Sequence, residues 1–162
     1  KNVLTVINAS TLKVEANWAI TGGEEPTGLA LDNKTHRLFT VCGNKVMIIM
    51  DATIGKVIAT LPIGDGCDGV AFDTELKRAY SSNGEGTITV VQEENENTFK
   101  VLETIPTQKG ARTICVNSKT HHLYLPAGEY EEAPPATKEN PRPRPKVKAG
   151  SFVIIDIESV KK

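Results

Sequence analysis

Short apolar runs alternate with polar turns along the chain, and one series of runs occurs three times. The copies comprise residues 26–32 (PTGLALD), 37–41 (RLFTV) and 46–51 (VMIIMD); 67–73 (CDGVAFD), 78–80 (RAY) and 88–91 (ITVV); and 111–117 (ARTICVN), 122–125 (HLYL) and 152–156 (FVIID). Runs of this length that are rich in Val, Ile, Leu and Thr predict β-strands. The apolar positions show no helical period, so the pattern predicts strands throughout.

The spacing of the copies indicates how these strands are organised. Asp32, Asp73 and Asn117 hold the same place in each copy and follow one another at 41 and then 44 residues. A period near 40 residues filled with short strands is typical of a β-propeller or a similar β array. We therefore expect an all-β fold of four-stranded antiparallel blades, present here as a partial ring of about three to four blades.

The phase of the repeat predicts how this single partial propeller domain, residues 1–162, is divided. Residues 1–21 match the back half of a blade, residues 22–63 and 64–107 match complete blades, and residues 108–162 match a last blade interrupted by a Pro/Arg-rich insertion at 129–150. The expected strand numbers are two, four, four and three. Blades at the ends of such an array expose apolar faces, so we expect the remainder of a propeller as partner. A missing N-terminal half is favoured over a second copy.

Composition excludes some classes of partner. The formal net charge is −1 and the pI about 6.4, so neither nucleic acid nor an anionic membrane is favoured on general electrostatic grounds. No apolar run approaches the roughly 18 residues of a membrane span, so membrane insertion is not expected. The three cysteines lack metal-ligand spacing. Cys115 lies in an apolar run and is expected in the core, whereas a disulfide between Cys42 and Cys67 is possible but not favoured.

The candidate ligand-binding residues lie in the loops that precede the first strand of each blade. In a propeller these loops, together with the turns between second and third strands, surround the mouth of the central channel. Repeat alignment puts Thr27, Asp68 and Arg112 at one equivalent position there, with Glu25 nearby. Asp68 and Arg112 could form a polar clamp for a small ligand or an ion pair that sets the register of the blades.

The same edge is also a candidate cation site. Glu24, Glu25, Asp65 and Asp68 make it acidic, and oxygen ligands of this kind could hold a divalent cation such as Ca²⁺. The spacing of a calcium-binding loop is absent from the sequence, however. No metal ligand and no cofactor is therefore assigned, and no residue is assigned a catalytic role.

The Pro-rich insertion is the second candidate surface. Its prolines cannot join a central strand ladder, so the sequence predicts a polyproline-like excursion. Three interpretations stay open: a solvated loop pinned across the surface, a basic arm for an acidic partner or a polyproline-recognising domain, and an arm neutralised by its own acidic residues. Single-stranded nucleic acid is a weaker partner for it. The cations of this candidate arm are Arg142, Arg144, Lys146 and Lys148.

Several longer segments of the chain resemble the YVTN-type β-propellers, specifically the C-terminal half of the YncE-like proteins. They are residues 24–30 (EEPTGLA), 55–64 (GKVIATLPIG), 84–90 (GEGTITV), 107–113 (TQKGART) and 120–126 (THHLYLP). The resemblance implies a seven-bladed ring, a periplasmic or secreted location and no shared catalytic motif. It also implies that relatives often carry a cysteine where Gly23 stands, able to pair with Cys42, so that Cys42 is free here.

These observations favour a non-enzymatic binding or scaffold propeller that acts through its central-channel face on a protein or small-molecule ligand. The alternative is a metal-dependent enzyme of the lactonase or hydrolase kind that uses channel carboxylates. Binding of an acidic partner or single-stranded nucleic acid through the basic arm is the third hypothesis.

Overall fold

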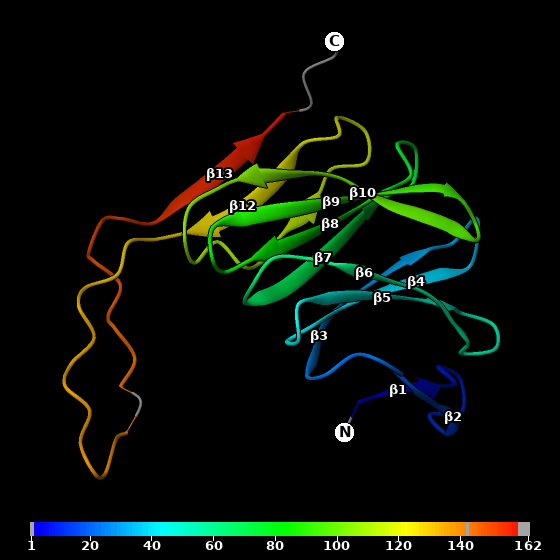
Figure 1. The fold of residues 1–162 in the computed structure, drawn as a ribbon, viewed down its shortest axis with the longest axis horizontal. Helices are drawn as coiled ribbons and strands as arrows, with labels where there is room; N and C mark the ends of the chain where they lie inside the picture. The colour runs from blue at the N-terminus through cyan, green and yellow to red at the C-terminus, as the bar shows by residue number, and fades with distance from the viewer. Residues whose placement is uncertain (1, 142, 159–162) are drawn as a thin grey trace.

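The computed structural model describes residues 2–141 and 143–158, and in this part of the chain every regular element is a β-strand (Figure 1). The strands form four antiparallel sheets of two, four, four and three strands. The sheets lie face to face as blades of an open, partial β-propeller, which confirms the predicted fold class. The first blade is β1 (Val3–Ile7) and β2 (Val14–Ala19); the second is β3 (Pro26–Asp32), β4 (Arg37–Cys42), β5 (Val46–Asp51) and β6 (Val57–Pro62); the third is β7 (Cys67–Asp73), β8 (Arg78–Asn83), β9 (Thr87–Asn95) and β10 (Thr98–Pro106); the last is β11 (Cys115–Val116), β12 (Leu123–Ala127) and β13 (Val153–Ile157).

No helix in the described residues is long and apolar enough to span a membrane.

The repeated Asp or Asn reverses the chain between the first and second strands of each blade. The Asp32 carboxylate accepts the Lys34 amide at 2.9 Å, and Asp73 and Asn117 accept the amide two residues ahead at 3.0 Å. Short side chains of this kind favour such turns because they hydrogen-bond to their own backbone. The repeat marker seen in the sequence is therefore a turn residue at the end opposite the predicted channel mouth.

Three apolar clusters hold the blades together, one at each seam. Leu4, Trp18 and Ile20 pack against the inner residues of β4 and β5 at the first seam. Phe39 stacks on Phe72 at the second seam, with ring centroids 4.7 Å apart. At the third seam, residues of β8 and β9 pack against β12 and β13. Alternate residues of one strand therefore serve two different seams, as the pleat of a β-strand requires.

The last blade has no neighbour on its outward face among the described residues. Ile155 and Ile157 pack into the third seam, whereas Phe152 and Ile154 are 66% and 54% exposed. Cys115 is also exposed, so the prediction that it is a core residue was wrong. The equivalent residue of the preceding blade, Ala71, is buried, since the last blade packs beside β7. Cys115 therefore stands at a strand position that is buried in the preceding blade, but its own outward face is not covered by any described residue.

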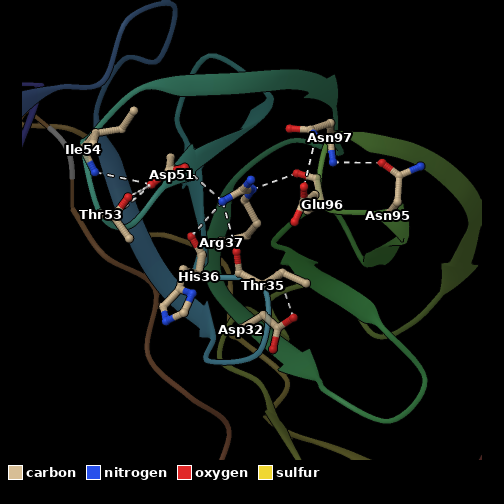
Figure 2. A network of polar contacts seen from close by, with 10 residues as sticks. All are labelled: Asp32, Thr35, His36, Arg37, Asp51, Thr53, Ile54, Asn95, Glu96 and Asn97. Carbon is tan, nitrogen blue, oxygen red and sulfur yellow. Dashed lines mark hydrogen bonds and ion pairs between the residues drawn. The ribbon is translucent and has the colours of Figure 1, made fainter.

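A buried arginine ties the second and third blades together at the turn end of the seam (Figure 2). Arg37 Nη1 lies 3.1 Å from Asp51 Oδ2, and Arg37 Nε donates to the Glu96 carbonyl of the next blade at 2.7 Å. Hydrogen bonds from Thr53 and from the Arg37 side chain stabilise the Asp51 carboxylate, so its pKa lies below the ordinary value. This network is structural.

Glu93, at the same seam, is a buried carboxyl group without a hydrogen-bond partner. It is 1% exposed, and neither side-chain oxygen has a partner among the described residues. Burial raises the pKa of Glu93 and the nearby Asp32 charge adds to the effect, while the Thr35 side chain, Lys77 and Arg37 oppose it. Ionisation of Glu93 therefore weakens the seam.

This arrangement predicts a specific pH dependence of stability. The native state holds the Glu93 proton more tightly than the unfolded chain, so the free energy of unfolding should fall as pH rises from the ordinary glutamate pKa to the raised one. Glu93→Gln should flatten this part of the profile, as measured by urea unfolding at several pH values. Glu103→Gln on β10 is the matched control. If Glu93→Gln left the profile unchanged, Glu93 would not titrate in this way.

Candidate functional site

The loops that enter β3, β7 and β11, together with the turns that follow β4, β8 and β12, form the edge that we call the channel face. Adjacent blades meet closely here. The Thr27 hydroxyl donates to the Cys67 carbonyl at 3.4 Å, and a Cβ added to Gly28 would lie 3.0 Å from the Val70 amide nitrogen. Gly69 holds the equivalent place against the Arg112 carbonyl. Glycine at this position lets successive inner strands approach each other.

Thr27 and Asp68 both sit at irregularities in the strand register. β3 and β4 shift register between Pro26 and Gly28, and β7 and β8 do so between Cys67 and Gly69. A β-bulge re-aims the side chain of its extra residue. The repeat therefore places the bulged residue of each inner strand on the channel face.

The structure brings two of the four predicted ligand-binding residues together. Arg112 Nη2 lies 3.3 Å from Asp68 Oδ2 across the seam, with both side chains partly exposed. Thr27 lies at the neighbouring seam, where its hydroxyl hydrogen-bonds to the carbonyl oxygens of Val41 and Cys67. The Glu25 carboxylate lies beside Gly43 and does not join the pair. The ion pair links the two blades, and its participation in ligand binding stays a prediction.

Direct hydrogen bonds close the channel face in the two complete blades. The Gly43 amide donates to the Glu24 carbonyl at 2.7 Å and to the Glu25 carbonyl at 3.3 Å. In the next blade, the Gly84 amide donates to the Gly66 carbonyl at 2.9 Å. In both cases the turn between second and third strands is fastened to the loop that enters the same blade.

The last blade departs from this arrangement. Its equivalent residues are Gly128 and Gly110, and no hydrogen bond joins their backbones in the described part of the chain. The next amide, that of Glu129, donates instead to Ser151 Oγ at 3.0 Å. The turn therefore leans away from the entering loop, because the Pro-rich insertion begins where the other blades have a tight turn.

A pocket of about 570 Å³ fills the resulting gap. The Tyr130 ring lies over Gly110, where an added Cβ would be 3.1 Å from Tyr130 Cε2. The pocket also adjoins the Asp68–Arg112 pair, since Gly84 lines it and the Arg112 side chain packs on Gly84. Its lining residues are Gly84, Gln108, Lys109, Gly110, Gly128, Glu129, Tyr130, Pro145 and Lys148.

The insertion itself extends from the blade as a long arm (Figure 1). Its base is a short two-stranded ladder, in which the Glu131 amide donates to Lys146 and the Lys148 amide to Glu129, both at 2.8 Å. The described residues of the arm extend away from the sheets into solvent, so the interpretation of a loop pinned across the surface was wrong (Figure 1). Arg144, Lys146 and Lys148 lie on the returning part, whereas Arg142 lies outside the described residues.

Two of the three cysteines and two of the three histidines are buried or engaged elsewhere. Cys42 and Cys67 are buried free thiols, and burial raises the pKa of Cys42 to about 11, which disfavours the nucleophilic thiolate. His121 Nδ1 lies 2.7 Å from Asp73 Oδ2, and His122 Nδ1 lies 2.8 Å from Asp156 Oδ1. Within residues 2–141 and 143–158, no three His, Cys, Asp or Glu side chains converge as metal ligands.

Sequence reasoning identified the edge but missed the pocket. A signal for it was present: the turn sequence Gly84-Glu85-Gly86 of the preceding blade is matched by Gly128-Glu129, after which the match breaks off at the insertion. A break in a repeat at the channel face marks a place where the surface differs from that of the other blades.

Comparisons with known proteins identify the architecture alone. The chain matches no known protein family and no curated protein. Among solved structures, it is similar to Kuenenia stuttgartiensis hydrazine synthase, with a TM-score of 0.72, 15% identity, and coverage of 97% of this chain and 40% of that one. It is also similar to the dihydro-heme d1 dehydrogenase NirN in complex with DHE, with a TM-score of 0.62, 12% identity, and coverage of 93% and 34%.

A third similar structure is a chain of the mitotic checkpoint complex, with a TM-score of 0.63, 14% identity, and coverage of 76% of this chain and 39% of that one. The chain thus spans well under half the length of each of these structures. Together with the sheet topology, the similarity establishes a partial β-propeller.

The exposed ion pair should contribute little to stability. Arg112→Ala is expected to lower the free energy of unfolding by less than about 1 kcal/mol, because exposed pairs are screened by solvent. Chemical denaturation measures this, and Lys45→Ala, which breaks the similarly exposed Lys45–Asp65 pair, is the control. A loss of several kcal/mol would show instead that Arg112 holds the seam together.

Proposed function

We propose that this propeller is a non-enzymatic binding module whose ligand site is the pocket on the channel face of the last blade. The observation that carries the proposal is the opened contact between Gly110 and Gly128, which creates a pocket where the other blades are closed by hydrogen bonds. A concave site with a few polar groups is the usual form of a small-molecule site. The Asp68–Arg112 pair stands beside the pocket and adds polar groups to its rim.

The arm makes the pocket possible. It supplies Glu129, Tyr130, Pro145 and Lys148 to the lining, and it replaces a tight turn. Residues that break a repeat at one position of a regular scaffold are the ones that can carry a specific function on it. On this proposal the blades provide the rigid support and the arm base provides the site.

The hydrolase alternative needs carboxylates that converge on a metal ion. The Asp68 carboxylate is paired with Arg112. Glu25 belongs to the preceding blade, where it lies beside Gly43 and away from Asp68. Binding through the arm alone would use its exposed cations instead of the pocket. No particular contact favours either alternative, and the experiment below separates both from the proposal.

We also propose that further blades of the same propeller cover the outward face of the last sheet. Phe152 and Ile154 are exposed there, and buried apolar sheet faces are what hold the described blades together. These further blades are the proposed protein partner of the described ones.

The proposed site is tested by restoring the tight turn. Residues 129–152 are replaced by the Glu-Gly pair of the preceding blade, so that Ala127 and Val153 stay paired as Asn83 and Thr87 are. In a thermal-shift screen of small molecules, a ligand of the pocket should raise the melting temperature of the full chain by several degrees at about 100 times its Kd. The variant should give no shift.

The control is a variant in which Arg144, Lys146 and Lys138 are replaced by Gln while the pocket lining is kept. It should retain the shift. A shift that survives the turn replacement would contradict the proposal, and one lost from both variants would place binding on the cations of the arm instead of the pocket. A rise in melting temperature that depends on Ca²⁺ would support the hydrolase alternative.

A further inference from the structure

The charge of the entering loops changes sign at the last blade. Each entering loop contains a residue with positive φ: Glu25, Gly66 or Gly110. The residue directly before it is Glu24 in the first complete blade, Asp65 in the second and Lys109 in the last. The residue equivalent to the bulge position also becomes basic in the last blade: it is Thr27 in the first complete blade, Asp68 in the second and Arg112 in the last. The channel face is therefore acidic over the first two entering loops and basic over the third, where the pocket lies.

We infer that the pocket binds a small organic anion, with its carboxylate or phosphate group at Lys109 and Lys148 and its apolar body against Tyr130 and Pro145. This inference rests on the proposed function and specifies the class of ligand. It follows from the charges, the backbone donors and the shape of the lining.

The charges of the lining favour an anion. Lys148 Nζ is 2.9 Å from the Glu129 carboxylate, so these two side chains neutralise each other. Lys109 has no ion-pair partner among the described residues, in contrast to Lys45, Lys100 and Arg112. The pocket therefore carries one uncompensated positive charge, which a single anionic group would balance.

The backbone offers further donors. The amides of Gly43 and Gly84 are used in bonds to the entering loops, but the equivalent Gly128 amide has no acceptor in the described part of the chain. Gly128 lines the pocket, so this donor is left for a ligand or for water. Gln108 adds a side-chain amide that lines the same pocket. Oxyanions commonly use backbone and amide N–H groups together with a cation.

The shape of the lining favours an organic body on the anion. The Tyr130 ring and Pro145 form apolar walls, and Gly84, Gly110 and Gly128 complete the lining. The volume of about 570 Å³ exceeds the need of an inorganic ion and suits a molecule of the size of an aromatic or short aliphatic acid.

Titration of the full chain with benzoate, phenyl phosphate and benzamide tests the inference, because benzamide has the shape of benzoate without the charge. The readout is the backbone NMR resonances of Gly84, Gly110 and Gly128. Benzoate or phenyl phosphate should shift these resonances saturably and less strongly at high salt, and benzamide should not. A preference between the two anions distinguishes a carboxylate from a phosphate ligand.

Lys109→Gln should weaken the binding of the anions by at least about fivefold, the loss expected for one charge-assisted contact. Lys34→Gln, in the turn at the opposite end of β3, is the matched control and should change nothing. Equal binding of benzamide, no saturable shift with either anion, or no effect of Lys109→Gln would overturn the inference. If the turn-replacement screen still finds a neutral or cationic pocket ligand, the proposed function stands while the anion inference fails.

Discussion

Burial of blades on both faces is the constraint on which the rest of the structure depends. Every residue of β4 is buried, and the alternate residues of β5 pack into two separate clusters, Met47 and Ile49 toward one seam and Ile48 and Met50 toward the other. A sheet that is covered on both faces needs neighbours on both sides. Gly28 and Gly69 let the first strands of adjacent blades approach each other closely. The loops that enter these strands therefore lie side by side and form the channel face.

The channel face derives its chemistry from this regularity and from one departure from it. Two blades fasten their turns to their entering loops by backbone hydrogen bonds, which leaves little room for a ligand. The last blade keeps the same strands but uses a long arm in place of the turn. The arm base replaces the turn that would join Gly128 to Gly110 and places the Tyr130 ring over Gly110, so the scaffold acquires a pocket without any change in the sheets.

Much of the fold could be predicted from the sequence because its signals are local. The strand alternation and the turn-forming residues Asp32, Asp73 and Asn117 recur at a nearly constant spacing, and the structure shows a turn at each of them. The Asp68–Arg112 contact was also accessible, since residues at equivalent positions of adjacent blades must lie near each other.

Other features depend on what surrounds a residue in space. Cys115 looks like a core residue in its strand, but its outward face has no blade against it. Glu93 looks like a solvent-facing strand residue, yet the structure buries it near Asp32 and Arg37 of the preceding blade. The pocket results from a hydrogen bond that is missing from the last blade in the described residues, and the sequence marks its place only indirectly, by the break in the repeat after Glu129. The inserted arm was visible in the sequence, but its projection from the blade was not.

The account is tested most directly by native-state hydrogen exchange. If burial on both faces sets stability, amides of β4 and β5 should exchange only through global unfolding. Amides of β13 that pair with β12 should open at a distinctly lower free energy. Equal protection of β5 and β13 in the isolated chain would contradict the account, because β13 would then be as stable with one covered face as β5 is with two.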